Sequence, residues 1–220
     1  MKVAASTLVS LPDELSFSAG AAISCGTGTA FNALRRIDLS SDDTIAIFGQ
    51  GPVGLSATQL ASAMNARVIA LDIPRHGKSI PPYDWYKEDE EYKLTAKFYA
   101  GILVAFCREL GLEKPVIMGS SMGGNICMHL AEKYESEFKA LIAIEACEHS
   151  PGWHIDWLRH SHIHGGETCA TSVFGLMAPQ SPDKYRWETW WYYAQSGPGV
   201  FKGDLYFYSV DHDFRGRSER

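Results

Sequence analysis

Short apolar runs alternate with longer segments of helical spacing along the first two-thirds of the chain. Four runs rich in β-branched and aliphatic residues are typical of buried parallel strands: "TIAIFG" (44–49), "RVIALDI" (67–73), "KPVIMGS" (114–120) and "KALIAIEAC" (139–147). The segments 12–36, 51–66, 92–112 and 123–138 favour helices. This alternation predicts an α/β protein with a parallel sheet of four or five strands, helices on both faces and a Rossmann-like first unit.

The apolar pattern also predicts faces and ends. In the long helix expected over 92–112, we place one group of apolar residues near a common face: Leu94, Phe98, Ile102, Ala105 and Phe106. After Cys147 the chain is rich in aromatic, histidine and turn residues, which indicates an irregular helical cap. The run "DLYFYSV" (204–210) is expected to be a short strand.

Composition narrows the class of protein. The 220 residues are 45% apolar and 21% charged, which is ordinary for a globular unit with one sizeable core. A net charge of −6 without a basic stripe argues against nucleic acid as a partner. No apolar run is long enough for a membrane span, and the start of the chain lacks a convincing signal-peptide cleavage site. With five cysteines at irregular spacing, these features predict a cytoplasmic protein with reduced thiols.

A glycine-rich turn follows the first strand. Residues 49–54, "GQGPVG", fit G-x-G-x-x-G, and Asp72 stands at the end of the next strand. In a dinucleotide site such glycines make the turn, admit the pyrophosphate and let the helix pack on the strand, while the acid accepts from the ribose hydroxyls. The pattern predicts that NAD binds at Gly49, Gly51, Gly54 and Asp72. The alternative is a tight turn that binds nothing.

Residues 5–73 resemble the middle of a medium-chain, zinc-dependent alcohol dehydrogenase. The stretches "SCGTGTAFNAL" (24–34) and "GQGPVGLSATQLA" (49–61) stand in that family's order and spacing. The resemblance implies that Cys25 matches a ligand of the catalytic zinc, whose other ligands come from a domain with no counterpart in this sequence. Because one thiolate cannot hold a zinc that needs three protein ligands, we expect no zinc and no alcohol dehydrogenase activity.

A second motif follows the third strand. Gly119-Ser120-Ser121-Met122-Gly123 fits G-x-S-x-G between a strand and a helix. Such a sharp turn lifts its middle serine above the sheet and needs small residues on both sides. Ser121 is therefore the candidate nucleophile, and the Met122 N–H is a candidate oxyanion donor.

Residues 71–217 resemble an α/β-hydrolase. The likeness rests on "LDIPRHGKS" (71–79), "VIMGSSMGGNICMHLAEKYESEFKALIAIEA" (116–146) and "HGGETCATSVFGLMAPQSP" (164–182). It implies a second oxyanion N–H from the loop after the "TIAIF" strand, at Gln50 or Gly51. It also implies a catalytic acid and histidine after later strands, for which this sequence offers no matching positions.

Local residues are candidates for the missing base. His149 lies just past the strand beside the elbow, and His212 lies near the end of the chain; either is a hypothetical base for Ser121. Histidines that face solvent or pack in the cap are the alternative. The nearby acidic residues are Glu145, Glu148, Asp156, Asp211 and Asp213.

The cap contains two further groups of residues. A histidine tract is best interpreted as a polar loop, although an extended segment could ligate a transition metal: His154, His160, His162 and His164. An aromatic group is expected to pack the cap, with an apolar acyl pocket or an exposed association patch as alternatives: Trp153, Trp157, Trp187, Trp190, Trp191, Tyr192 and Tyr193.

We interpret the chain as a hybrid in which the two families meet at the strand "VIALD", a unit that both contain. It divides into a dehydrogenase-like segment (1–73), a hydrolase core segment (74–147) and a cap-like segment (148–220). The expected strand order is "VIALD", "TIAIF", "PVIMG", "LIAIE", with unpaired edges that favour a homo-oligomer. Two functions stay open: a weak serine hydrolase for a small ester, or a non-catalytic scaffold that binds a dinucleotide or nothing.

Overall fold

The computed structural model describes residues 6, 8–49, 51–79, 92–150, 165–177, 181–195 and 200–217. Several sequence-based candidates lie outside these residues: Gln50, Trp153, Asp156, Trp157 and the histidine tract at 154–164. Among the described residues, no helix is long and apolar enough to cross a membrane.

A four-stranded parallel sheet forms the centre of the molecule. Its strands are β1 (Thr44–Phe48), β2 (Arg67–Leu71), β3 (Val116–Ser120) and β4 (Ala140–Ile144), in the order β2-β1-β3-β4. The strand order predicted from the sequence is confirmed. Phe48 pairs with Leu71 on one side and with Gly119 on the other, so the loops after β1, β2 and β3 leave the sheet side by side. Ligands of open α/β sheets bind at this edge.

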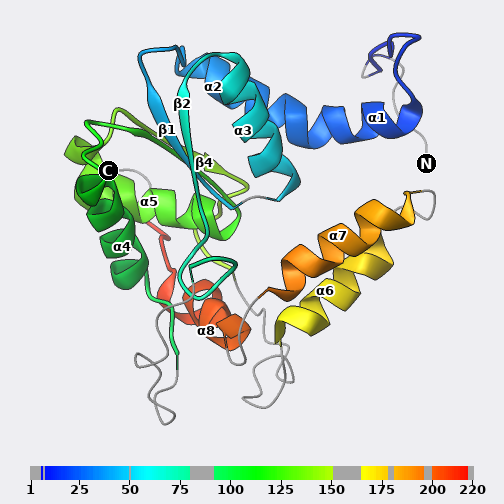
Figure 1. Cartoon of the computed structure of the whole chain (residues 1–220). Coiled ribbons are helices and arrows are strands. Elements are labelled where there is room, and N and C mark those ends of the chain that lie inside the picture. Colours follow the sequence, from blue (N-terminus) through cyan, green and yellow to red (C-terminus); the bar gives the residue numbers. More distant parts are fainter. Residues whose placement is uncertain are drawn as a thin grey trace.

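Helices cover both faces of the sheet (Figure 1). One face is covered by α2 (Gly28–Arg36) and α3 (Pro52–Ala63), and the other by α4 (Ala96–Glu109) and α5 (Met122–Tyr134). The short helix α1 (Phe17–Ala22) continues through a π-helical turn, Ile23–Thr27, into α2. Successive strand residues point to opposite faces: Ile45 and Ile47 belong to the core under α2 and α3, whereas Ala46 and Phe48 belong to the core under α4 and α5.

The buried face of α4 differs from our expectation. Phe98 is 42% exposed and Ala105 is also exposed, whereas the helix buries a neighbouring stripe: Ala96, Tyr99, Ala100, Leu103, Val104 and Cys107. This stripe follows i, i+3, i+4, i+7 spacing more fully than the one we predicted. Apolar residues occur around most of the helix, and only the position of the sheet decides which of them it buries.

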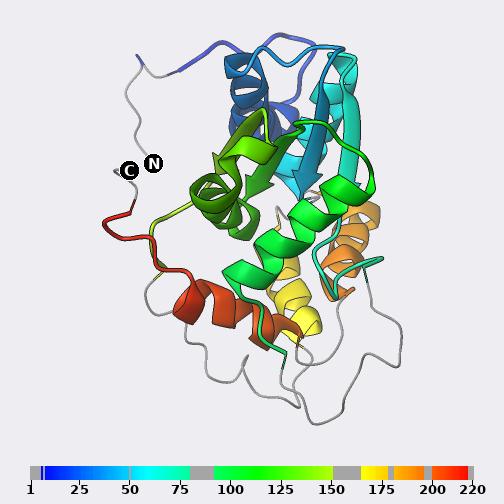
Figure 2. The same ribbon diagram turned by 90° about the vertical axis from the view of Figure 1, so that its left-hand side faces the viewer.

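The cap is helical, as expected. It consists of α6 (Gly165–Leu176), α7 (Asp183–Ala194), α8 (Val200–Tyr206) and a π-helical turn (Phe207–Asp211). Figures 1 and 2 show α6 and α7 side by side, with α8 below the sheet. A short 3-10 turn, Glu135–Glu137, follows α5.

The strand expected at 204–210 is wrong, because this segment is helical. The buried residues Val200, Gly203, Asp204 and Phe207 recur with a helical period that places one face against the core. Phe207 meets Tyr99 of α4 edge to face, with ring centroids 6.2 Å apart. The expected fifth strand is therefore not found in this segment.

Candidate functional site

The turn between β3 and α5 has the backbone of a nucleophile elbow. Ser121 has φ +56° and ψ −114°, a conformation that side chains rarely adopt and that stores strain. A Cβ at Gly119 would overlap the backbone of Gly123, and a Cβ at Gly124 would overlap the carbonyl oxygen of Ile144. Close backbone approach thus requires glycine at Gly119 of the motif and at Gly124 just after it. The Ser121 N–H donates to the Ile144 carbonyl (2.9 Å), which ties the turn to β4.

The elbow opens into a cavity of about 620 Å³. The cavity collects residues from the ends of all four strands and from the cap. From the sequence-based candidates it includes Ser121, Met122, Gly49 and Asp72. Gly51, Gly54 and His149 are not among the described residues that line it. The motifs of both segments therefore face the same space.

Ser121 is hydrogen-bonded to a tyrosine of the cap. Its Oγ lies 2.5 Å from the hydroxyl oxygen of Tyr208, which also accepts from the Met122 N–H. Burial raises the pKa of Tyr208, and the hydrogen bonds from Ser121 and Met122 oppose this rise only in part. The phenol is therefore neutral at pH 7 and a poor proton acceptor. Tyr208 occupies the place where the predicted oxyanion donor points.

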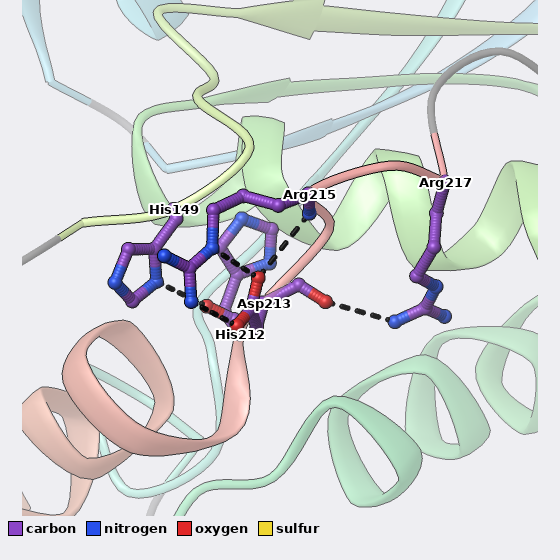
Figure 3. Close-up of polar contacts among 5 residues, drawn as sticks. All are labelled: His149, His212, Asp213, Arg215 and Arg217. Atoms are coloured by element: carbon purple, nitrogen blue, oxygen red, sulfur yellow. Dashed lines mark hydrogen bonds and ion pairs between the residues drawn. The ribbon is translucent and has the colours of Figure 1, made fainter.

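The candidate histidines form a separate group (Figure 3). The two ring nitrogens of His212 lie 2.9 Å from Nε2 of His129 and 2.7 Å from the carbonyl oxygen of Cys147. Both nitrogens of His212 thus have partners other than Ser121. His149 has its Nδ1 3.5 Å from the His212 carbonyl oxygen, and its role as a base for Ser121 stays a prediction.

The candidate acids take part in local contacts. Asp213 accepts from the guanidinium of Arg215, which lowers the pKa of Asp213 (Figure 3). Asp211 accepts from the backbone N–H of Ala96 (2.5 Å) at the start of α4. Glu145 lies at the cavity and accepts from the Ser120 hydroxyl (3.1 Å). None of these contacts joins an acid to a histidine that faces Ser121 in the described part of the chain.

A second polar pair in the cavity was not predicted. Nε2 of His76 lies 2.8 Å from Oδ2 of Asp204, and both residues line the cavity. Nδ1 of His76 lies 3.1 Å from the Pro74 carbonyl oxygen. Burial opposes protonation of His76, but Asp204 and Pro74 outweigh it and raise its pKa. No sequence signal pairs these residues, because His76 follows β2 and Asp204 lies in the segment expected to be a strand.

The glycine turn keeps part of a dinucleotide site. Gly49 has φ +85°, Gly51 precedes the first turn of α3, and the space beside both α-carbons is open. In dinucleotide-binding proteins, open space of this kind at a helix N-terminus admits the pyrophosphate. At the other end, Asp72 accepts from the Lys78 N–H (2.9 Å), and a Cβ at Gly77 would overlap its carboxylate. Asp72 therefore holds its own loop, and a ribose would have to replace that contact.

No group of three or more His, Cys, Asp or Glu residues is placed to hold a metal among the described residues. Cys25 lies in the π-helical turn between α1 and α2.

Comparison with known proteins finds similarity to both kinds of family. Residues 54–161 match the family model of the alpha/beta hydrolase fold. A zinc-type alcohol dehydrogenase-like protein of Escherichia coli is 45% identical over 67 residues, which is 30% of this chain and 19% of that protein. The alcohol dehydrogenase of Geobacillus stearothermophilus is 38% identical over 72 residues, covering 33% of this chain and 21% of the enzyme. The matched stretch thus spans about a fifth of these relatives.

Among solved structures, the enol-lactonase of Burkholderia xenovorans is similar with a TM-score of 0.60 and 14% identity. The match covers 77% of this chain and 66% of the lactonase. At this identity the likeness shows the fold alone. Together the comparisons support a hybrid: a dehydrogenase-like segment joined to a hydrolase-like one, on a hydrolase-like scaffold.

Proposed function

We propose that this hybrid of a dehydrogenase-like and a hydrolase-like segment acts as a weak serine hydrolase on small carboxylic esters. The observation that carries the proposal is the strained Ser121 turn, which presents a hydroxyl to a cavity of about 620 Å³. Strain of this kind is kept at functional sites. The cavity is of the size that holds small ligands.

In the proposed reaction, Ser121 Oγ attacks the ester carbonyl carbon and forms an acyl-enzyme. The alcohol leaves with the proton that Ser121 loses, and water then cleaves the acyl group to give the acid. The carbonyl oxygen would take the place of the Tyr208 hydroxyl, where the Met122 N–H donates. The second donor is proposed in the loop after β1, at Gln50 or Gly51, as the hydrolase resemblance implies.

Weak turnover follows from the groups around Ser121. A serine needs a base within hydrogen-bond reach to become a good nucleophile. The group found at that distance is the neutral phenol of Tyr208. Acylation by activated esters is therefore expected, since their leaving groups need little help, whereas unactivated esters should react slowly.

Intact mass after incubation with a fluorophosphonate probe tests this proposal. The wild type should gain one adduct, and Ser121→Ala should gain none. Ser120→Ala is the matched control, because Ser120 lines the same cavity but bonds to Glu145; it should be labelled like the wild type. Absence of labelling in the wild type would leave a non-catalytic scaffold.

A second candidate function is dinucleotide binding, supported by the open glycine turn at Gly49–Gly51. NAD would lie with its pyrophosphate at the start of α3 and its ribose near Asp72. The test is the fluorescence of NADH on titration into the protein, with Asp72→Asn as the variant. Unchanged fluorescence at millimolar protein would exclude this function.

A further inference from the structure

The Ser121 cavity contains a polar pair that the proposed hydrolysis does not use. His76 follows β2 and Asp204 lies on α8, so the hydrolase core and the cap each contribute one member. The 2.8 Å contact between His76 Nε2 and Asp204 Oδ2 fixes one oxygen of the carboxylate. The other carboxylate oxygen of Asp204, Oδ1, takes no part in this contact.

Asp204 is 5% exposed, and its Oδ1 is buried without a hydrogen-bond partner among the described residues. Buried carboxylate oxygens are normally paired, because leaving one without a donor is unfavourable. Asp204 lines the cavity. Oδ1 has almost no accessible surface, so a donor from a ligand at this end of the cavity would reach it only after a small movement of the neighbouring side chains.

The charge of the residues that line the cavity indicates which kind of ligand group would donate to Asp204 Oδ1. The His76–Asp204 pair has no net charge, whichever member holds the shared proton. Asp72 and Glu145 also line the cavity, and no described lining residue is Lys or Arg. The described part of the lining is therefore negative, which favours a cation and disfavours a carboxylate or phosphate.

Much of the remaining lining is apolar. Phe48 and Ile73 contribute from the sheet side, and Tyr193, Phe201 and Leu205 contribute from the cap. Such surfaces bind an aliphatic or aromatic body, and aromatic rings also attract a cation. A ligand suited to both parts has one positive charge on a compact apolar body.

We infer that the cavity selects ligands with a primary ammonium group on a short apolar body, and that Asp204 Oδ1 accepts from the ammonium. Resting on the proposed function, this makes the substrate an ester of an amine-bearing acid or alcohol. The ammonium N–H groups supply the missing donor, and the negative lining supplies the preference for the cation.

Binding of a matched charge series to the full chain tests the inference. The probes are 2-phenylethylammonium, 2-phenylethanol and phenylacetate, titrated at pH 7 and followed by calorimetry or ligand-observed NMR. The ammonium should bind about tenfold more tightly than the alcohol, and the carboxylate should bind most weakly. Equal affinity for the three probes, or preference for the carboxylate, overturns the inference.

Asp204→Asn should remove the preference for the ammonium over the alcohol. Glu137→Gln is the matched control, since it removes one carboxylate outside the cavity lining; it should leave the preference unchanged. Equal effects of the two substitutions would overturn the role of Asp204. If Asp204→Asn does not fold, the wild-type series at low and high salt decides, because a cation held by the lining must weaken as salt rises.

These measurements separate the two proposals. Ser121→Ala should bind the ammonium like the wild type, because binding does not need the nucleophile. Ammonium preference without fluorophosphonate labelling would overturn the hydrolase function alone. Labelling of Ser121 without ammonium preference would overturn this inference alone.

Discussion

At the scale of single residues, the contact between Ser121 and Tyr208 controls what the elbow can do. The two residues are 87 positions apart, and their side-chain oxygens are 2.5 Å apart. Tyr208 engages both the nucleophile and the Met122 N–H. Because the phenol of Tyr208 is neutral, it does not act as a base for Ser121. Its hydroxyl instead occupies the position that the carbonyl oxygen of an ester would take.

Tyr208→Phe should therefore increase the rate of fluorophosphonate labelling. Loss of one hydrogen bond, worth about 1 kcal/mol, corresponds to a gain of about fivefold. The measurement is the second-order labelling rate by intact mass. Tyr193→Phe, at another tyrosine of the cavity lining, is the control and should change little. A slower rate in Tyr208→Phe would instead mean that the hydroxyl assists the attack.

The buried His129–His212 pair should make stability depend on pH. Burial, with repulsion from His212 and Arg217, lowers the pKa of His129 to about 4. The unfolded chain, with a pKa near 6.5, therefore binds the proton first as pH falls. The contribution of neutral His129 to the free energy of unfolding is therefore complete above pH 6.5 and is lost progressively as the pH falls towards 4.

Urea unfolding at pH 7.5 and pH 5 measures this effect. The wild type should lose about 2 kcal/mol between these pH values through His129. His129→Gln retains a donor for His212 but does not titrate, so it should show a smaller loss. An equal loss in both proteins would assign the pH dependence to other groups.

At the scale of elements, the helix α8 shows how tertiary packing decides secondary structure. The segment "DLYFYSV" favours a strand by composition. Its burial follows a helical period, and the carbonyl oxygen of Gly203 accepts from the Leu94 N–H (3.1 Å). Gly203 lies so close to Tyr92 that any side chain there would overlap the ring.

Gly203→Ala should therefore destabilise the protein by about 1–3 kcal/mol, the usual effect of overpacking. Gly175→Ala on α6 is the matched control, because nothing lies near the added methyl. That change should be neutral or stabilise the protein by several tenths of a kcal/mol, as alanine is the better helix former. Urea unfolding of both variants at pH 7.5 provides the comparison. Similar results for the two would mean that α8 does not pack against Tyr92 in solution.

At the scale of the whole molecule, β2 and β4 are the edge strands of the sheet, and no further strand pairs with them in the described part of the chain. Exposed aromatic side chains provide further apolar surface: Trp191 is 61% exposed on α7 and Phe17 is 91% exposed on α1. Among the described aromatic candidates, Tyr193 lines the cavity, Trp187 contacts Phe174 of α6, and Trp187 also meets Trp190 within α7. Open strand edges and exposed rings favour self-association.

We expect a homo-oligomer formed through a sheet edge. Light scattering after size exclusion should give at least twice the chain mass of 24.3 kDa. Ala70→Lys places a charge at an exposed position of β2, and Ala143→Lys does the same on β4. The substitution on the edge in use should return the mass to that of the monomer. A monomeric wild type would contradict the expectation.

The sequence by itself determined the strand order, the position of the elbow and the two inherited motifs. The positions of the strands and of the elbow follow from local patterns: buried strands have continuous apolar runs, and a nucleophile turn needs small residues at set positions. The strand order follows from the resemblance of the chain to the two families. Because parallel strands end at one edge, the glycine turn after β1 and the elbow after β3 had to meet there.

Only the tertiary structure decided what surrounds Ser121. Tyr208, His76 and Asp204 come to one cavity from segments that no motif connects, and Asp72 is occupied by its own loop. The same holds for the buried face of α4 and for the helical state of residues 204–210. Local pattern is ambiguous wherever apolar residues occur on several faces, and the choice is then made by contacts between distant parts of the chain.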